Sequence, residues 1–364
     1  MTKVYDTATD IITFARLQSQ NTTSGSSYLG SDGLLKFAAE DEPRIEYGSD
    51  GSLKGLLIEE QRTNLVTYSE DFSEWLTTGS ASLGTIVTAP TGDEAAVTLD
   101  LLNVSSALYE TATVAANVPH TFSVWLKGDV AGTIRLARSN SGSDGDNVPV
   151  STEWTRQTVT ITPTTTSDGP QIRRDSAGQL DKVYIYGAQL EQGSFPTSYI
   201  PTSGSQQTRS ADVASIPVSA FGYNQDAGTV VVEAQVADTS VSNAGDLRIK
   251  TTTGFIFTDA GSRVGGFPAG SYTVYSPTTS ILMRVDTVLS DGQPYKAAYS
   301  IAESNSALSV NGSSVVIDQT TTIAGKTASL FELGKGSSFL NGHIKSLKYY
   351  PRRLTDAQLQ ELTA

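Results

Sequence analysis

The chain has 364 residues, which favours two or three domains, and only 17% of its residues are charged. Strand-prone Val, Ile, Thr and Tyr are plentiful and Gly occurs 32 times, so the composition favours short strands and turns over helices. The net charge of −13 argues against nucleic acid and anionic membrane surfaces as partners, and the absence of cysteine excludes disulfides and thiolate metal sites.

Nothing in the sequence indicates membrane insertion or a signal peptide. No segment reaches the roughly 18 to 20 apolar residues that a membrane-spanning helix needs. The N-terminal sequence MTKVYDTATDIITFARLQ lacks an apolar core followed by a small-residue cleavage site. We therefore expect no membrane insertion, and the cysteine-free composition fits assembly in a reducing compartment.

Residues 1–66 are expected to form an attachment or packing segment rather than a domain. Short segments with apolar residues at 11–17 and 34–38 are separated by the loop sequence NTTSGSSYLGSDG. A GSDGS turn then separates 44–47 from 56–58. This apolar content is too small for an independent core, so the segment should lie against the following sandwich or against another subunit.

The sequence GLLIEEQRTNL, with the YSEDF segment and Trp75 that follow it, resembles a block of phage tail and head fibre proteins and their prophage relatives. The preceding SDGLLKFAAEDEPRIEY resembles the block just upstream in those proteins. From the residues alone, the apolar run at 56–58 predicts a buried strand. Glu59, Glu60 and Arg62 are expected to be solvated or paired with one another.

The chain from 67 to 205 is predicted to form one sandwich of jelly-roll type. Strands separated by turns are expected at 95–102, 109–114, 120–127, 132–138, 156–161 and 182–191. In HTFSVWLKG, three apolar residues should share one face of the strand and Trp125 should lie on the other. Trp154 is expected between the two sheets, and Trp75 should anchor the N-terminal segment.

The segment from 181 to 216 begins as a strand and then breaks. Tyr184 and Tyr186 alternate with apolar residues, with Gly187 expected on the face opposite the tyrosines. The phrase GAQLEQGSFPTSYIPTSG, with FSVWLKG and EWTRQTVTITPT, resembles the carbohydrate-binding-module-like jelly rolls of phage fibres. Its prolines and Tyr199 favour a segment that packs down instead of a loose linker.

A second sandwich is predicted over 206–364. Its strands are expected at 228–236, 247–252, 254–258, 271–275, 281–288, 294–301, 307–310 and 314–317. The dipeptide Asn311-Gly312 should form the tight turn of a hairpin. A final strand followed by PRRLTDAQLQELT resembles the end of concanavalin A-like and laminin G-like sandwiches.

A short helix is expected after Pro351. Thr355 should be its N-cap, Gln358 the third residue of a capping box, and Leu354 should pack on Leu359. Together these elements predict an all-β fold: an N-terminal extended arm, two antiparallel β-sandwiches (jelly-roll type, then concanavalin A-like) and a short C-terminal helix.

Candidate catalytic residues are few. His120, at a strand start, and His343, in a turn, are expected to have structural or surface roles. A glycan-cleaving site needs two carboxylates roughly 5 to 10 Å apart, and the Glu-x-Asp-x-Glu pattern of concanavalin-like glycosidases is absent. Glu59 and Glu60 point to opposite faces of a strand, and Glu233 stands alone. We therefore expect a protein that is not an enzyme.

Calcium is the one cofactor for which the sequence offers candidate ligands. SGSDGDN places Asp144, Asp146 and Asn147 in a Gly-rich loop, and these side chains carry the hard oxygen ligands that Ca²⁺ prefers. The spacing differs from that of an EF-hand, and acidic Gly-rich turns also occur without metal. No cofactor is expected otherwise.

Flat aromatic faces beside hydrogen-bonding side chains are typical of carbohydrate-binding sandwiches. In the first sandwich the candidates are Trp125, Tyr184 and Tyr186, although the two tyrosines could equally pack under the N-terminal arm. In the second sandwich they form a looser set, namely Tyr272, Tyr275, Tyr295, Tyr299 and Arg263.

The resemblance implies a virion fibre or spike protein, assembled in the bacterial cytoplasm, that binds host surface polysaccharide without cleaving it. Its N-terminal segment would contact other virion proteins. Fibres of this kind are commonly trimers, but the sequence shows no coiled-coil heptads to hold one. The alternatives are a glycan-cleaving depolymerase and a structural adaptor without a ligand. The same blocks would also serve in a gene transfer agent.

Overall fold

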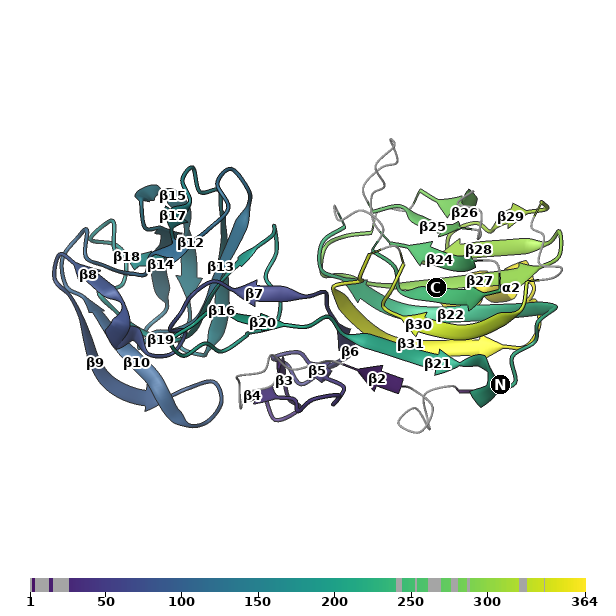
Figure 1. The fold of residues 1–364 in the computed structure, drawn as a ribbon, viewed down its shortest axis with the longest axis horizontal. Helices are drawn as coiled ribbons and strands as arrows, with labels where there is room; N and C mark the ends of the chain where they lie inside the picture. Colours follow the sequence, from purple (N-terminus) through teal and green to yellow (C-terminus); the bar gives the residue numbers. More distant parts are fainter. Residues whose placement is uncertain are drawn as a thin grey trace. The chain divides into compact units, whose positions relative to one another are not determined.

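The computed structural model describes residues 2–3, 13–15, 26–239, 244–252, 254–260, 270–275, 281–286, 289–320, 326–336 and 338–364. The chain divides into two compact units (Figure 1). Unit 1 takes its residues from Met1–Arg16, Asp41–Glu60 and Ala211–Ala364, and unit 2 from Leu17–Glu40 and Gln61–Ser210. Each unit is an antiparallel β-sandwich, and a short helix ends the chain, so the predicted all-β fold is confirmed.

Unit 2 contains two five-stranded sheets. The first sheet has the order β16 (Thr155–Ile161), β13 (His120–Lys127), β19 (Lys182–Gln192), β10 (Glu94–Leu101) and β9 (Ala81–Thr88). The second has the order β15 (Ser141–Val150), β14 (Gly132–Arg138), β18 (Pro170–Arg173), β11 (Ala107–Tyr109) and β8 (Leu76–Thr78). Phe122, Val124 and Leu126 of β13 face Ile134 and Leu136 of β14 in the core between the sheets, as strand alternation predicts.

Several expectations for unit 2 need correction. The segment 141–150, expected as a Gly-rich loop, is strand β15, which is held by its ladder with β14. Trp154 is half-buried outside the main core, where its Nε1 donates to the Thr88 carbonyl at 3.1 Å. Trp75 does belong to the core, and its Nε1 donates to the Tyr68 carbonyl at 2.8 Å.

A β-bulge at Gly187 changes which residues of β19 face the core. Ser123 of β13 pairs with Gln189 while Trp125 pairs with Tyr186, so two residues of β19 oppose one of β13. Gly187 has a φ of +60°, a left-handed conformation that glycine adopts without steric cost. Tyr184 and Tyr186 face outward before the bulge, and Gln189 and Glu191 face outward after it.

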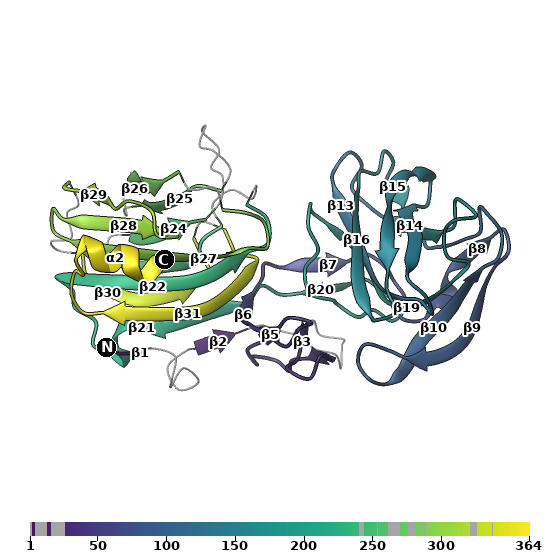
Figure 2. The ribbon, with the colours of Figure 1, turned by 180° about the vertical axis from the view of Figure 1, so that it is seen from behind.

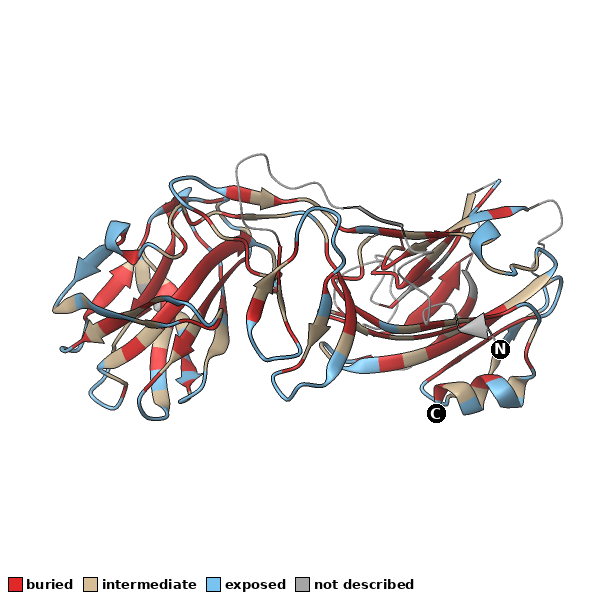
Figure 3. Cartoon of the chain, turned by 90° about the horizontal axis from the view of Figure 1, so that it is seen from below, coloured by how far each residue is buried: buried red, intermediate tan, exposed pale blue. Residues whose placement is uncertain are grey.

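Unit 1 contains the two larger sheets, whose layers are seen from opposite sides in Figures 1 and 2. The eight-stranded sheet has the order β29 (Val316–Asp318), β28 (Ser306–Val310), β27 (Pro294–Ala302), β22 (Ala227–Val236), β31 (Gly342–Tyr350), β6 (Leu53–Ile58) and β5 (Ile45–Tyr47), with β1 (Thr2–Lys3) also pairing with β31. The seven-stranded sheet has the order β2 (Thr13–Ala15), β21 (Val213–Pro217), β30 (Ala328–Leu333), β23 (Leu247–Thr251), β24 (Gly254–Asp259), β25 (Tyr272–Tyr275) and β26 (Ile281–Val285). In both units the buried residues follow the inward faces of the strands, and exposed residues gather at the turns (Figure 3).

The C-terminal helix α2 (Asp356–Thr363) has the predicted capping box. Thr355 Oγ1 accepts from the Gln358 amide at 3.3 Å, and Gln358 Oε1 accepts from the Thr355 amide at 3.0 Å. Leu354 and Leu359 lie in one small apolar cluster with residues of β22 and β31. Within the part of the chain that the structure describes, no helix is long and apolar enough to cross a membrane.

Two predictions about turns in unit 1 have different outcomes. Asn311 and Gly312 have φ values of +48° and +72° and form the predicted tight turn between β28 and β29. His343 lies in β31 and not in a turn, and its Nε2 is 2.6 Å from Glu46 Oε2. The imidazole therefore links β31 to β5, the strand at the edge of the same sheet.

The described parts of residues 1–66 extend both sandwiches. The hairpin β5–β6 adds to the edge of the eight-stranded sheet of unit 1, where β6 pairs with β31. The hairpin of β3 (Ser27–Leu29) and β4 (Leu35–Phe37) packs on unit 2, where the Leu35 amide donates to the Pro90 carbonyl at 2.9 Å. The predicted attachment to another protein stays a prediction.

The segment Gln61–Ser210 is an insertion between two segments of unit 1. Its first strand, β7 (Arg62–Asn64), pairs antiparallel with its last, β20 (Gln207–Arg209). In unit 1, the Asp212 amide donates to the Glu59 carbonyl at 3.0 Å. The insertion therefore begins and ends at one place in the sandwich of unit 1.

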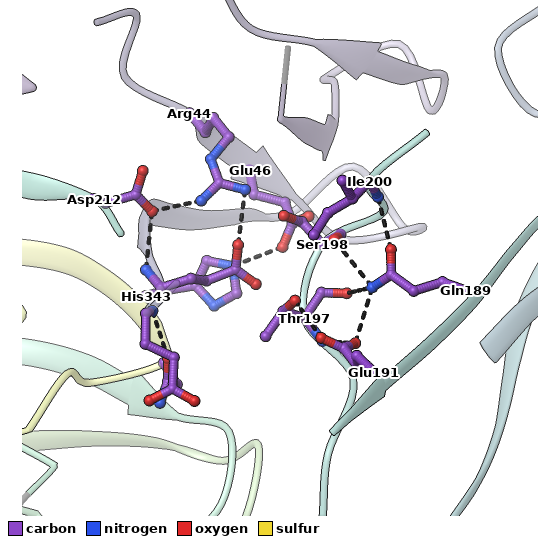
Figure 4. A network of polar contacts seen from close by, with 12 residues as sticks. Arg44, Glu46, Gln189, Glu191, Thr197, Ser198, Ile200, Asp212 and His343 are labelled. Atoms are coloured by element: carbon purple, nitrogen blue, oxygen red, sulfur yellow. Dashed lines mark hydrogen bonds and ion pairs between the residues drawn. The ribbon is translucent and has the colours of Figure 1, made fainter. Parts of the chain in front are cut away.

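Arg44 joins the two sides of this insertion point inside unit 1. Its guanidinium lies 2.5 Å from Asp212 Oδ2 (Figure 4). It also lies 2.8 Å from Glu59 Oε2, and all three residues are buried. Burial acts to lower the pKa of Arg44, but the two carboxylates raise it, so the guanidinium stays charged. We call these three residues the Arg44 clamp. Glu59 was expected to be solvated or paired with its neighbours in sequence, and this expectation is wrong.

Candidate functional site

The aromatic residues predicted in unit 2 do share one sheet face, but most of that face is covered. Tyr186 is only 3% exposed, and its hydroxyl donates to Glu70 Oε1 at 3.0 Å. The ring of Tyr199 lies edge-on against it, and Leu35 of the β3–β4 hairpin belongs to the same cluster. Of the two expectations for Tyr186, packing is therefore correct, and an open stacking ledge is not.

Two buried side chains of β19 hold the covering segment down. Glu191 accepts hydrogen bonds from the Thr197 amide and hydroxyl, both at 2.7 Å. Gln189 accepts from the Ile200 amide at 2.7 Å (Figure 4). Tyr199 is 1% exposed, so the prediction that this proline-containing segment packs down is confirmed.

The other two aromatic candidates on this face are partly accessible. Trp125 is half-buried, and its Nε1 has no hydrogen-bond partner among the described residues. Tyr184 donates its hydroxyl to Asp129 at 2.6 Å, and Lys182 Nζ lies 5.5 Å from the centre of its ring. One face of this ring is already occupied by the lysine, which leaves less of it for a ligand.

The tyrosines predicted as a ligand-contacting set in unit 1 lie in its interior. Tyr272, Tyr275, Tyr295 and Tyr299 are each at most 2% exposed, so their rings present no surface on which a sugar could stack. This placement corrects the expectation of a surface set. Arg263 lies outside the described residues.

Asp246 gives two of these tyrosines a structural role. Its Oδ2 accepts from Tyr272 at 2.8 Å and from Tyr295 at 2.9 Å, and its Oδ1 accepts from Thr258. Burial raises the pKa of Asp246, and the donating hydroxyls lower it only in part. This is a polar network inside an apolar core, fully supplied with hydrogen bonds.

Two of the three residues considered for calcium are engaged by other side chains. Asp144 pairs with Arg138 Nε at 2.7 Å, and Asn147 Oδ1 accepts from Gln179 at 2.8 Å. Asp146 is exposed on β15. Within the described ranges, no group of three or more His, Cys, Asp and Glu side chains is placed to hold a metal ion. His120 is buried, with its Nδ1 2.8 Å from the Val118 carbonyl.

The outer face of the second sheet of unit 2 carries a different polar arrangement. Strand alternation turns Ile134, Leu136 and Ile172 into the core and their neighbours outward. We call the outward set the arginine face; it consists of Tyr109, Arg135, Asn147, Gln171 and Arg173. The β-ladders place Arg135 opposite both Asn147 and Arg173, and Gln171 opposite Tyr109.

The two guanidinium groups of the arginine face share one carboxylate. Asp175 Oδ2 lies 3.1 Å from Arg135 Nε, and its Oδ1 lies 2.5 Å from Arg173 Nε. Gln179 fixes the loop that carries Asp175, because its Oε1 accepts from the Asp175 amide at 2.5 Å. The side chains of Arg135 and Arg173 are 17% and 22% exposed, so both are held in place yet reachable by solvent.

Tyr109 and Gln171 complete the face. The ring of Tyr109 is half-buried, and among the described residues its hydroxyl has no hydrogen-bond partner. Gln171 Oε1 accepts from Arg173 Nη1 at 3.3 Å, which is a long bond. A planar ring beside two guanidinium groups and an amide can recognise polar, ring-shaped molecules.

These observations define an all-β protein of two antiparallel sandwiches with a pre-ordered polar sheet face. No family model and no curated protein matches the chain. Among solved structures, it is similar to the N-terminal CBM22-1–CBM22-2 tandem domain of Xyn10C from Paenibacillus barcinonensis, with 10% identity. The match covers 80% of this chain and 99% of that one, with a TM-score of 0.30. At that TM-score the similarity assigns no role to any residue.

Proposed function

We propose that this chain is a non-catalytic carbohydrate-binding protein and that the arginine face is its sugar-binding surface. The observation that carries the proposal is the placement of a half-buried tyrosine ring beside the buried Gln171 and the partly exposed Arg173 on paired strands. Sugar rings present apolar C–H faces that stack on aromatic rings and hydroxyls that need fixed hydrogen-bonding partners. Because the face is built on strands, it needs little ordering when a ligand binds.

In the first test, the purified full chain is applied to an array of bacterial surface glycans. Tyr109→Ala is expected to weaken binding about tenfold, because an aromatic stacking contact contributes about 0.5–1.5 kcal/mol beyond its buried area. Tyr184→Ala, on the other sheet of the same unit, serves as the matched control and should bind like the wild type.

Two results would contradict this assignment. If Tyr184→Ala abolishes binding and Tyr109→Ala does not, the ligand occupies the other sheet. If no glycan is bound at all, the proposal of carbohydrate binding fails. Release of new reducing ends from a bound glycan would favour the depolymerase alternative.

The wider role that we propose is that of a fibre or spike on a phage-type particle, which adsorbs to host surface polysaccharide. Its support is the ordered series of sequence blocks from Ser31 onward that resemble phage fibre proteins. Purified particles from a producing culture should contain the chain in mass spectrometry and bind antibodies raised against it. A chain found only in the particle-free fraction would contradict a virion location.

A further inference from the structure

We propose that unit 1 carries a binding site for a phosphate group, formed by Arg248 and Lys335 at one end of the β23–β30 ladder. Arg248 belongs to β23 and lies directly opposite Glu332 of β30. Lys335 lies in the turn that follows β30. The proposal is independent of the arginine face, because that face belongs to unit 2.

Arg248 is held in position from two sides. Its Nε and Nη2 donate to the two carboxylate oxygens of Glu332 at 2.6 and 2.8 Å, and its guanidinium carbon lies 4.4 Å from the centre of the Phe255 ring. Leu247 and Ile249 belong to the core, so strand alternation turns Arg248 outward. Its side chain is 20% exposed, and among the described residues its Nη1 donates to no acceptor. This nitrogen is therefore available to a ligand.

The ammonium of Lys335 is positioned by an aromatic ring. Its Nζ lies 4.1 Å from the centre of the Phe339 ring. The turn that carries both residues is closed by a backbone hydrogen bond, which the Leu340 amide donates to the Gly334 carbonyl at 2.9 Å. Within the part of the chain that the structure describes, the ammonium forms no hydrogen bond and no ion pair. Its three N–H groups are therefore available as well.

The two positive groups are close enough to act on each other. Burial lowers the pKa of Lys335, the charge of Arg248 lowers it further, and Glu332 opposes these effects only in part. An anion bound at Lys335 and Arg248 would relieve this repulsion. Because both side chains are partly shielded from water, their attraction for an anion is screened less than that of open surface charges.

The other described charges of these strands do not neutralise the pair. Lys250, two residues after Arg248 on the same face of β23, is exposed and adds a third positive charge. Asp212, just before β21, is buried and is bound by the Arg44 clamp at 2.5 Å. Asp246, just before β23, is also buried, and its carboxylate accepts from hydroxyl groups of the core.

The free donors fit a phosphate group better than a carboxylate. The Glu332 carboxylate already occupies the fork of Arg248, so the ligand meets one guanidinium nitrogen and one ammonium group. A phosphate monoester has three terminal oxygens and about 1.5 to 2 negative charges at pH 7, which two separate cations can share. A carboxylate has two oxygens and one charge. Lysine binds phosphate as a point charge, whereas arginine adds a directed N–H bond.

The test observes the lysine side chains directly. The full chain, produced with lysine labelled with ¹³C at Cε, is titrated with glucose 6-phosphate, with glucuronate and with glucose. Glucose 6-phosphate should shift the Lys335 signal and raise the pKa of Lys335, because a bound anion favours the charged form. Its affinity should exceed that of glucose about tenfold or more. The ligands are small, so that the net charge of −13 on the chain does not repel a long polyanion.

Variants show whether binding occurs at this turn. Lys335→Gln identifies the signal by its loss and should weaken binding of glucose 6-phosphate about tenfold. Phe339→Leu keeps both charges but removes the ring that positions the ammonium, so it should weaken binding about threefold. Lys345→Gln is the matched control, because it removes one positive charge from the other sheet of unit 1 and should leave the affinity unchanged.

Each remaining outcome would contradict part of the proposal. If glucose 6-phosphate leaves the Lys335 signal in place, or if glucose shifts it equally, the phosphate site does not exist. Equal affinities for glucuronate and glucose 6-phosphate would overturn the preference for phosphate over carboxylate. Binding that survives Lys335→Gln unchanged would overturn the assignment to this residue. If Lys335→Gln does not fold, the wild-type titration and Phe339→Leu still decide the question.

Discussion

Arg44→Met is expected to lower the free energy of unfolding of unit 1 by about 3–5 kcal/mol, because it leaves two carboxylates buried without their cation. Glu59 and Asp212 are 5% and 1% exposed, so water cannot replace the guanidinium. Hydrogen exchange in urea measures the effect, read on the amides of β6 and β21. The fluorescence of the three tryptophans, all of which lie in unit 2, follows the other sandwich separately.

Lys345→Gln is the matched control for the Arg44 clamp. Lys345 forms an ion pair with Glu233 at 3.0 Å in the same unit, but its side chain is 46% exposed. An exposed pair of this kind should change stability by no more than about 0.5 kcal/mol. If Arg44→Met lowers the free energy of unfolding no more than Lys345→Gln does, the clamp does not stabilise the insertion point.

Asp246→Ala is expected to destabilise unit 1 by about 3 kcal/mol or more. The substitution removes the acceptor for three buried hydroxyl groups. Each hydroxyl is then buried away from water without a hydrogen bond, which costs free energy. Calorimetry of the full chain, with exchange of the β25 and β27 amides to assign the transition, measures the change. Wild-type exchange of these amides in Asp246→Ala would contradict a structural role for this network.

The raised pKa of Asp246 also predicts that the stability of unit 1 depends on pH. Its pKa in the folded chain is raised by burial above the unfolded value of about 3.9, so the fold favours the neutral acid. Its contribution to stability should be complete below about pH 4 and be lost as the pH rises through the folded-state pKa. Asp246→Asn, which keeps the shape and cannot ionise, should not show this loss. Identical pH profiles for the two proteins would contradict the prediction.

Local patterns in the sequence predicted many of the strands but not how the chain connects them. The segments 120–127 and 132–138 were predicted with the observed bounds, because large apolar residues alternate clearly there. Strand β15 was missed because SGSDGDN has little intrinsic preference for a strand, and its ladder with β14 decides its structure. The Arg44 clamp joins residues 168 positions apart, which no local pattern can reveal.

Tyr186, one residue of the predicted site, is buried for a tertiary reason. Tyr184 and Tyr186 do point away from the core, as their alternation indicated. Tyr186 is nevertheless covered, because the segment carrying Tyr199 returns over it and is held there by Glu191. The arginine face was not predicted because it needs β18, whose sequence begins with Pro170 and is only four residues long. Unless β18 is recognised as a strand, the sequence does not show that Arg173 lies next to Arg135 of β14.

The position of the insertion has a consequence for how the protein is made on the ribosome. Strand β6 is synthesised before the inserted sandwich, whereas β31, its partner in the sheet, is the last strand of the chain. Strand β6 can pair with β5 at once, but its edge toward β31 must stay without a partner while Gln61–Ser210 emerges. An apolar strand with one open edge is prone to wrong pairing, so a nascent chain that stalls before Gly342 should depend on chaperones to stay soluble.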